Sequence, residues 1–168
     1  EEQEDLSQNR QETPKIQHTM VNPFAGIEFP VLCDVFDQLR VGNCLPLILL
    51  MNKKADLDLK AVDMYGYAPI HYAVVQGNLE LIELITKQQP DSVSTLSRHW
   101  QTPLMIACNT GNSAIVRHLV QRLEALRLDD IDQWGFNALT YCVKANNIAS
   151  FCYLLANGAR LDRKFKDL

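Results

Sequence analysis

The stretch Asp63-Met-Tyr-Gly-Tyr-Ala-Pro-Ile-His-Tyr-Ala73 decides the fold of this chain, because two later stretches repeat its pattern. They are Ser97-Arg-His-Trp-Gln-Thr-Pro-Leu-Met-Ile-Ala107 and Asp132-Gln-Trp-Gly-Phe-Asn-Ala-Leu-Thr-Tyr-Cys142. Their starts lie 34 and 35 residues apart along the chain. A pattern that returns at such a regular spacing is typical of repeat proteins, so the three stretches predict three copies of one structural unit.

Each stretch is followed by the parts of a helix–turn–helix unit. The pairs Gly77-Asn78, Gly111-Asn112 and Asn146-Asn147 come next, and Gly and Asn tolerate the positive φ of a tight turn. Apolar residues at helical spacing follow each pair. The pattern predicts helices at 31–40 and 44–52, 67–76 and 79–89, 101–110 and 113–124, and 136–146 and 148–157.

Two residue types suit the inside of such a unit. Pro69 and Pro103 are placed to open the first helix, where the missing N–H of proline costs no hydrogen bond. Small residues follow at Ala73, Ala107 and Cys142, where helices of adjacent units must approach closely. Because one short helix pair cannot bury its apolar face alone, we expect the stacking of units to supply the core.

The register also extends toward the N-terminus, where Gly42-Asn43 marks the turn of a fourth, degenerate unit that starts near Glu28. The polar residues Asp34, Asp37, Gln38 and Arg40 suit the outward face of a capping repeat. Residues 1–20 have a net charge of −3 and few apolar side chains, which is typical of a flexible acidic tail. The predicted organisation is this tail, an N-terminal extension with a degenerate capping repeat at 21–62, repeats at 63–96, 97–131 and 132–162, and the start of a further repeat or a cap at 163–168.

The Ala-Pro-Ile-His-x-Ala stretch from Ala68 and the Thr-Pro-Leu-Met-x-Ala stretch from Thr102 resemble the T-P-L-H-x-A signature of ankyrin repeats. The resemblance covers residues 28–162, most of the chain. It implies an all-α ankyrin-repeat solenoid of about four helix–turn–helix repeats with short β-hairpin-like loops.

Two departures from the family pattern stand out. The Thr–His pair of the signature is never complete, because the facing residues are Ala68 and His71, Thr102 and Met105, and Asn137 and Thr140. Trp100 also stands where the family places a turn glycine. A bulky residue at positive φ is unfavourable, so we expect the extra residue before Ser97 to re-form that turn.

Composition narrows the class of protein. The chain has 168 residues, a net charge of −4 and no Lys/Arg cluster, which argues against nucleic-acid binding. Its longest apolar run, 44–51, is far below the roughly 20 residues of a membrane span, so we expect no direct membrane insertion. Five cysteines without a CxxC pair indicate buried free thiols in a reducing setting, either cytosolic or nuclear, and the location we predict is cytoplasmic. Since the first residue is not Met, we expect a longer parent protein.

The sequence predicts no catalytic residue, no metal site and no cofactor. His71, the most tempting candidate for acid–base chemistry, occupies a signature position and is expected to be a structural hydrogen-bonding residue. None of the four histidines has a Cys, Asp or Glu at the spacing of a metal ligand. Glycine-rich phosphate loops and nucleophile motifs are also absent from the sequence.

The ankyrin resemblance instead implies that a partner binds the concave face, which hairpin tips and first helices form. Tyr65, His99 and Trp134 share one repeat position and are expected to stack as a ladder of rings. Whether Tyr67 and Phe136 contact a partner or only cover the neighbouring hairpin stays open at this point. The predicted partner-binding residues are Tyr65, Tyr67, Tyr72, Gln76, His99, Gln101, Asn109, Trp134, Phe136, Tyr141 and Lys144.

Two functions remain from the sequence alone. The first is a monomeric, non-catalytic scaffold module that binds a protein or peptide partner on its concave face. The alternative is the cytosolic ankyrin domain of a larger membrane protein, such as a protein S-acyltransferase or a channel, which recruits substrates or regulators.

Overall fold

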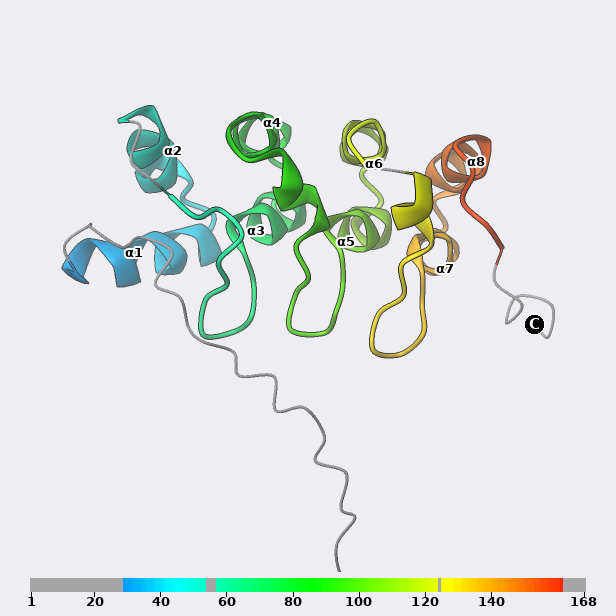
Figure 1. Cartoon of the computed structure of the whole chain (residues 1–168), viewed down its shortest axis with the longest axis horizontal. Helices are drawn as coiled ribbons and strands as arrows, with labels where there is room; N and C mark the ends of the chain where they lie inside the picture. The colour runs from blue at the N-terminus through cyan, green and yellow to red at the C-terminus, as the bar shows by residue number, and fades with distance from the viewer. Residues whose placement is uncertain (1–28, 54–56, 124, 162–168) are drawn as a thin grey trace, which may run out of the picture.

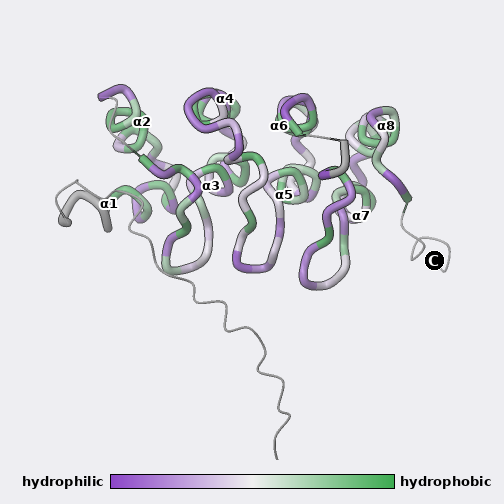
Figure 2. Tube along the Cα trace, viewed as in Figure 1, coloured by the Kyte–Doolittle hydropathy of each residue, from purple (hydrophilic) through white to green (hydrophobic). Residues whose placement is uncertain are grey.

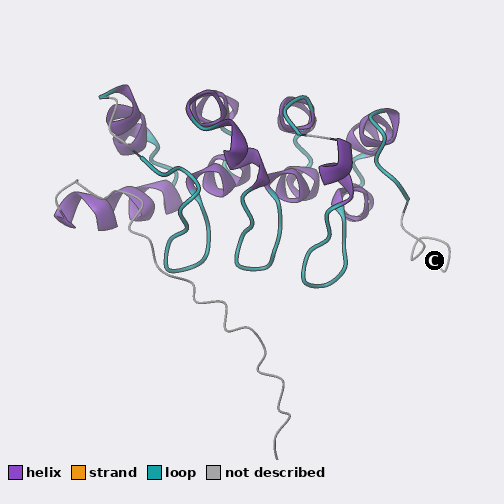
Figure 3. Cartoon of the chain, viewed as in Figure 1, coloured by secondary structure: helices purple, strands orange, loops and turns teal. Residues whose placement is uncertain are grey.

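The computed structural model describes residues 29–53, 57–123 and 125–161. These residues form eight α-helices and two short 3₁₀ helices and contain no strand, which confirms the all-α prediction (Figure 3). The predicted tail at 1–20 and the segment at 163–168 lie outside the described residues. The elements are α1 (Phe29–Arg40), α2 (Leu45–Asn52), α3 (Pro69–Val75), α4 (Leu79–Gln88), η1 (Pro90–Ser94), α5 (Pro103–Thr110), α6 (Ser113–Val120), η2 (Ala125–Asp129), α7 (Ala138–Lys144) and α8 (Ile148–Ala156).

The helices lie in two rows, as Figure 1 shows. The inner row consists of α1, α3, α5 and α7, and the outer row consists of α2, α4, α6 and α8. Three loops leave the inner row on the side away from the outer row, and we call them the hairpin loops (63–67, 97–101 and 132–136). Each inner helix packs on the inner helix of the next repeat, so the array is the expected solenoid.

The core lies between the two rows. Helices α4 and α6 of the outer row bury one apolar stripe toward the inner row, for example Leu81, Ile82 and Ile85 of α4, while their hydrophilic residues face away (Figure 2). Ala73 and Ala107 are fully buried at the contacts between neighbouring inner helices, as their small side chains predict. Burial of each large apolar side chain of this core, such as Leu81, stabilises the fold by roughly 1.5–3 kcal/mol, and the stacking of repeats completes that burial.

Local sequence accounts for the helix boundaries. Pro69 and Pro103 open α3 and α5 as predicted, and Gly77, Gly111 and Asn146 have positive φ angles of 71°, 76° and 52° in the tight turns. The next residue in each turn is an Asn that caps the outer helix. The three capping bonds run from Leu81 N to Asn78 Oδ1, from Ile115 N to Asn112 Oδ1 and from Ser150 N to Asn147 Oδ1.

Most helix boundaries lie within two residues of the prediction, but the end of one helix and the two short 3₁₀ helices were not predicted. Helix α6 ends at Val120 instead of continuing to 124, because the chain tightens into turns there and then forms η2. Pro90 opens the other unpredicted element, η1, since proline cannot continue the hydrogen bonding of α4 but suits the start of a new helix.

In the repeat that begins at Asp63, we call the junction between the hairpin loop and the start of α3 the corner. The completely buried His71 closes this corner with hydrogen bonds. Its Nδ1 accepts a hydrogen bond from the N–H of Ala68 at 3.0 Å, so Nε2 carries the proton and donates to the carbonyl oxygen of Thr95 at 3.1 Å. Burial lowers the pKa of His71 to about 4, because a charged imidazolium would lose its hydration there. The imidazole is therefore neutral and structural.

The next two repeats close the same corner with other side chains. Thr102 accepts a hydrogen bond from the backbone N–H of Met105 at 3.2 Å. In the last repeat, Asn137 Oδ1 accepts from both the backbone N–H and the hydroxyl of Thr140, each at 3.0 Å. Thr102 and Asn137 are N-caps of their inner helices, whereas in α3 the N-cap is Ala68 and His71 at the third helical position makes the bond. Each repeat thus satisfies the start of its inner helix, which explains why the incomplete signature still gives regular repeats.

The expectation for Trp100 is wrong. The loop is not re-formed, and Trp100 takes a left-handed conformation with φ of 61°, close to the 77° of Gly66 and Gly135 at the equivalent positions. The hydrogen bonds that close the loop are the same in all three repeats. Those bonds hold the backbone in place against the unfavourable contacts of the Trp100 Cβ.

Candidate protein-binding face

The hairpin loops are built alike and are held at their base by one side chain each. The backbone N–H of Asp63, Ser97 and Asp132 donates to the carbonyl four residues later, at 2.9–3.0 Å. The Oδ1 of Asp63 accepts from two N–H groups of its own loop at 2.9 and 3.0 Å, and Asp132 does the same. Ser97 Oγ makes longer bonds of 3.2–3.3 Å. Each loop is therefore a closed, internally bonded unit.

Neighbouring loops are also bonded to one another. The N–H of Arg98 donates to the carbonyl of Gly66 at 2.8 Å, and the N–H of Gln133 donates to the carbonyl of His99 at 3.2 Å. The Cβ of Arg98 lies so close to Gly66 that a Cβ at position 66 would approach it to 2.6 Å. The three loops thus form one continuous, fixed edge along the array (Figure 1).

The predicted ladder of rings forms in part. His99 and Trp134 stack with centroids 5.1 Å apart and an angle of 33° between the rings. Gln133 Nε2 lies 3.0 Å from His99 Nδ1 and fixes the imidazole further. Tyr65 instead lies under the guanidinium of Arg40, whose central carbon is 4.5 Å from the ring centroid. Trp134 remains 49% exposed and Tyr65 40% exposed.

The question left open for Tyr67 and Phe136 has a mixed answer, because each ring is half-buried. Tyr67 packs edge-on against Tyr72, with centroids 5.9 Å apart, and Phe136 packs in the same way against Tyr141 at 6.2 Å. Both rings therefore support a neighbour of their own repeat and still present one side to solvent.

Two of the predicted binding residues serve mainly to hold the face together. Tyr141 is only 6% exposed, and its hydroxyl donates to Asp132 Oδ2 at 2.5 Å while accepting from Gln101 Nε2 at 2.6 Å. Burial and the bond to Asp132 raise the pKa of Tyr141 to about 12. The equivalent Tyr72 donates to Asp63 Oδ2 at 2.6 Å. Tyr141 positions its neighbours and offers a partner little surface.

The remaining predicted residues lie closer to solvent. Gln76 is half-buried and reaches back to the first repeat, where its side chain donates to the carbonyl of Leu39 and accepts from Cys44 Sγ. Asn109 and Lys144 are exposed at the ends of α5 and α7. The Lys144 ammonium lies 3.7 Å from the ring centroid of Phe136.

A groove of about 450 Å³ brings several of these residues together. It runs from the end of α1 past the first hairpin loop and across α3 to α5. Arg40 lines it, although the sequence interpretation assigned this residue to the outward face of a cap. Its register position, two residues before the turn glycine, was the signal that could have placed it here. The groove is lined by Arg40, Tyr65, Tyr67, His71, Tyr72, Val75, Gln76, Gln101, Ile106 and Asn109.

The comparisons with known proteins agree with this architecture. A family model described as ankyrin repeats (3 copies) matches residues 87–165. Protein phosphatase 1 regulatory subunit 27 of Homo sapiens is 32% identical over 95 residues, which are 56% of this chain and 60% of that protein. Ankyrin repeat protein nuc-2 of Neurospora crassa is 23% identical over 134 residues, 75% of this chain and 12% of that protein.

Residues 87–165 therefore match the ankyrin-repeat family, and the resemblance seen in the sequence is confirmed. Ankyrin repeats are generally protein–protein interaction modules and are typically non-catalytic. The chain spans less than two thirds of the length of these relatives. Within the described residues, every helix is too short or too polar to cross a bilayer.

Proposed function

We propose that this chain is a non-catalytic module that binds a segment of a protein partner along its inner face, the concave face expected from the sequence. By inner face we mean the surface made by the hairpin loops and the exposed sides of the inner helices. The observation that carries the proposal is the exposure of Trp134 and Tyr65 on loops that are fixed by hydrogen bonds. Tyr and Trp are enriched among the residues that dominate binding energy.

The rigidity of the loops supports the same proposal. A ring on a flexible loop loses conformational entropy when it binds, whereas a pre-ordered ring loses little. Trp134 is held by its stack on His99 and by the closed loop beneath it. The groove that Tyr65 lines adds apolar surface from Val75 and Ile106 and amide groups from Gln101 and Asn109. Such a mixture suits a peptide, whose backbone needs hydrogen-bond partners while its side chains need apolar contacts.

The experiment begins with affinity capture of partners by the whole chain and continues with affinities for one captured partner. Trp134→Ala and Tyr65→Ala should each weaken binding about tenfold, because truncation of an aromatic anchor costs roughly 2 kcal/mol or less at a half-exposed site. Leu45→Ala is the matched control, since Leu45 is an exposed apolar residue on the outer helix α2. Normal affinity of both aromatic variants, or an equal loss for Leu45→Ala, would refute the proposal.

We also propose that the module acts as a monomer in a reducing, cytoplasmic setting. Cys44, Cys108, Cys142 and Cys152 are free thiols, the first three of them buried. Cys108 and Cys142 face each other in adjacent repeats, where hydrogen bonding and burial raise the pKa of the Cys108 thiol. Light scattering and thiol titration in denaturant test the two parts of this proposal, which expects one chain per particle and five titratable thiols.

A further inference from the structure

Four residues of the inner face occupy the same register position, two residues before the turn of their repeat. They lie at or next to the C-terminal end of the four inner helices, and all four are exposed. The first three also line the groove. In chain order, they are Arg40, Val75, Asn109 and Lys144. We call these four residues the column. The column has a cation at each end, with an aliphatic and an amide side chain between them.

Each cation of this column lies over an aromatic ring and keeps hydrogen-bonding capacity. Arg40 lies over Tyr65 and forms an ion pair with Asp37, but a guanidinium has five N–H donors and the described contacts use two of its nitrogens. Lys144 lies over Phe136 and, within the described part of the chain, forms no hydrogen bond or ion pair. Both side chains can therefore donate to a carboxylate of a bound segment.

The other carboxylates of the inner face are already engaged. Asp63 and Asp132 accept from backbone N–H groups of their own loops and from the hydroxyls of Tyr72 and Tyr141. Asp132 is also buried. A basic segment would find few carboxylate oxygens available for hydrogen bonds, whereas an acidic segment would find donors at both ends of the column.

The spacing of the column restricts the conformation of a bound segment. Packed helices are about 8–10 Å apart, so neighbouring column residues are separated by about that distance. A polyproline II segment has three residues per turn and rises about 3.1 Å per residue, which places every third side chain on one face about 9 Å apart. A β-strand cannot match this spacing with every third side chain, because its side chains alternate between faces.

We infer that the inner face recognises an acidic, extended partner segment of polyproline II type, with the pattern acidic–x–x–aliphatic–x–x–polar–x–x–acidic. This inference rests on the proposed function and adds the chemistry of the partner to it. Either chain direction satisfies the charges at the two ends. The aliphatic residue packs on Val75 in the groove, and the polar residue meets the Asn109 amide.

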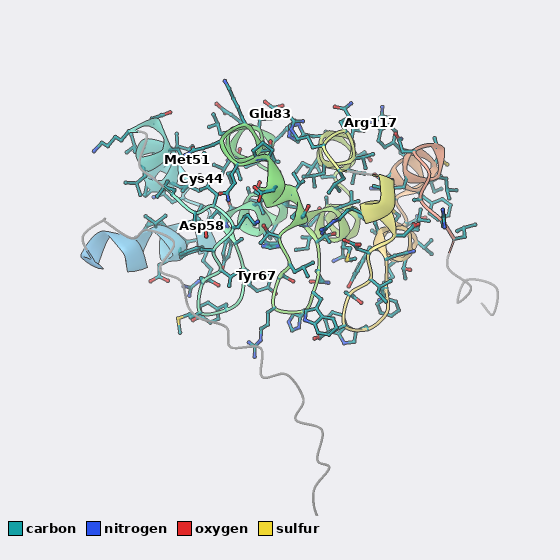
Figure 4. All side chains as sticks on the ribbon, viewed as in Figure 1. Cys44, Met51, Asp58, Tyr67, Glu83 and Arg117 are labelled. Atoms are coloured by element: carbon teal, nitrogen blue, oxygen red, sulfur yellow. The ribbon has the colours of Figure 1, made fainter. Side chains whose placement is uncertain are left out.

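The test uses the whole chain and a fluorescein-labelled peptide of sequence DPALPASPAE, whose binding is followed by fluorescence anisotropy. The comparison peptides are KPALPASPAK, which reverses both charges, and DPALPASPEA, which moves the last acid by one residue. Arg40→Gln and Lys144→Gln should each weaken binding of the first peptide about fivefold to tenfold, the loss of one charge-assisted hydrogen bond. Lys87→Gln on the outer helix α4 is one matched control. Arg117→Gln on the outer helix α6 is the other (Figure 4).

The inference expects the acidic peptide to bind more tightly than both comparison peptides and to lose affinity only with the two inner-face variants. Equal or tighter binding of the lysine peptide, no binding of the acidic peptide, or no effect of Arg40→Gln and Lys144→Gln would overturn it. The proposed function would survive such a result if Trp134→Ala still weakened a captured natural partner. It would fail separately if that variant bound the natural partner normally.

Discussion

The repeat that begins at Asp63 and the repeat that begins at Ser97 reach the same backbone geometry with different side chains. The first closes its corner with a buried His71 and its loop with Gly66. The second uses the Thr102 cap and accepts Trp100 at positive φ. What the two share is the set of backbone hydrogen bonds within and between the loops. The comparison teaches that the stack fixes the geometry, while the signature residues are one of several ways to satisfy it.

The largest effect is expected at the corner. His71→Ala leaves the Ala68 N–H and the Thr95 carbonyl without their buried partner and should lower the free energy of unfolding by about 3 kcal/mol. Thr102→Ala removes only one N-cap and should cost about 1 kcal/mol. Urea unfolding of both variants measures the difference. Equal losses would mean that the two corners contribute alike.

The difference between the two corners should also appear in how the free energy of unfolding depends on pH. The folded-state pKa of His71 is lowered to about 4 from 6.5, so its stabilising contribution is complete above pH 6.5 and is lost as pH falls toward 4. The total loss from this group is about 3 kcal/mol. Burial lowers the pKa of His118 too, which adds a loss of the same sign. Urea midpoints at pH 7 and 4.5 should therefore differ less in His71→Ala than in the unsubstituted chain, and an equal difference would contradict a neutral, buried imidazole.

Two glycine substitutions distinguish the energetic cost of a strained backbone conformation from the cost of a close contact between loops. Gly66→Ala introduces a Cβ at φ of 77° that would also approach Arg98 Cβ to 2.6 Å, so it should destabilise by about 2–3 kcal/mol. Gly111→Ala is the control, because it has the same φ range but no atom within 4 Å of the added Cβ. It should cost about 1 kcal/mol in thermal or urea unfolding. If both cost the same, the contact between neighbouring loops contributes little.

The smallest effect has the opposite sign. Trp100→Gly removes a bulky residue from positive φ and should stabilise the chain by about 1 kcal/mol, although it deletes a tryptophan. Trp100 is 56% exposed, so the lost burial is small. A higher urea midpoint is the expected result. A lower midpoint would show that the Trp100 ring packs more strongly than its exposure indicates.

Much of the fold could be predicted because its signals are local. A helix start such as Pro103 and a turn such as Gly111-Asn112 are written into neighbouring residues, and the repeat spacing places them in register. The ends of α4 and α6 were harder. The 3₁₀ helix that begins at Pro90 depends on how the chain crosses to the next hairpin loop, which no local pattern specifies.

The candidate face was predicted only in outline, because its details depend on contacts between repeats. The burial of Tyr141 follows from a bond to Gln101 of the preceding repeat, 40 positions away in the sequence. Arg40 reaches Tyr65 of the next repeat, 25 positions away in the sequence. The loop that holds Trp100 is likewise bonded to both neighbouring loops, through the N–H of Arg98 and the carbonyl of His99. Register alone names the positions that share a face, but only the stacked structure shows which of them remain available to a partner.

The most direct test of the account is a map of where a captured partner contacts the chain. The measurement is a ¹⁵N–¹H correlation spectrum of the whole chain with and without the partner. The account predicts shifts at the Trp134 indole N–H and at backbone amides of the hairpin loops, α3 and α5, with unchanged amides around Glu83 and Arg117 on the outer row (Figure 4). Shifts confined to α4, α6 and α8, with the Trp134 indole unmoved, would contradict it.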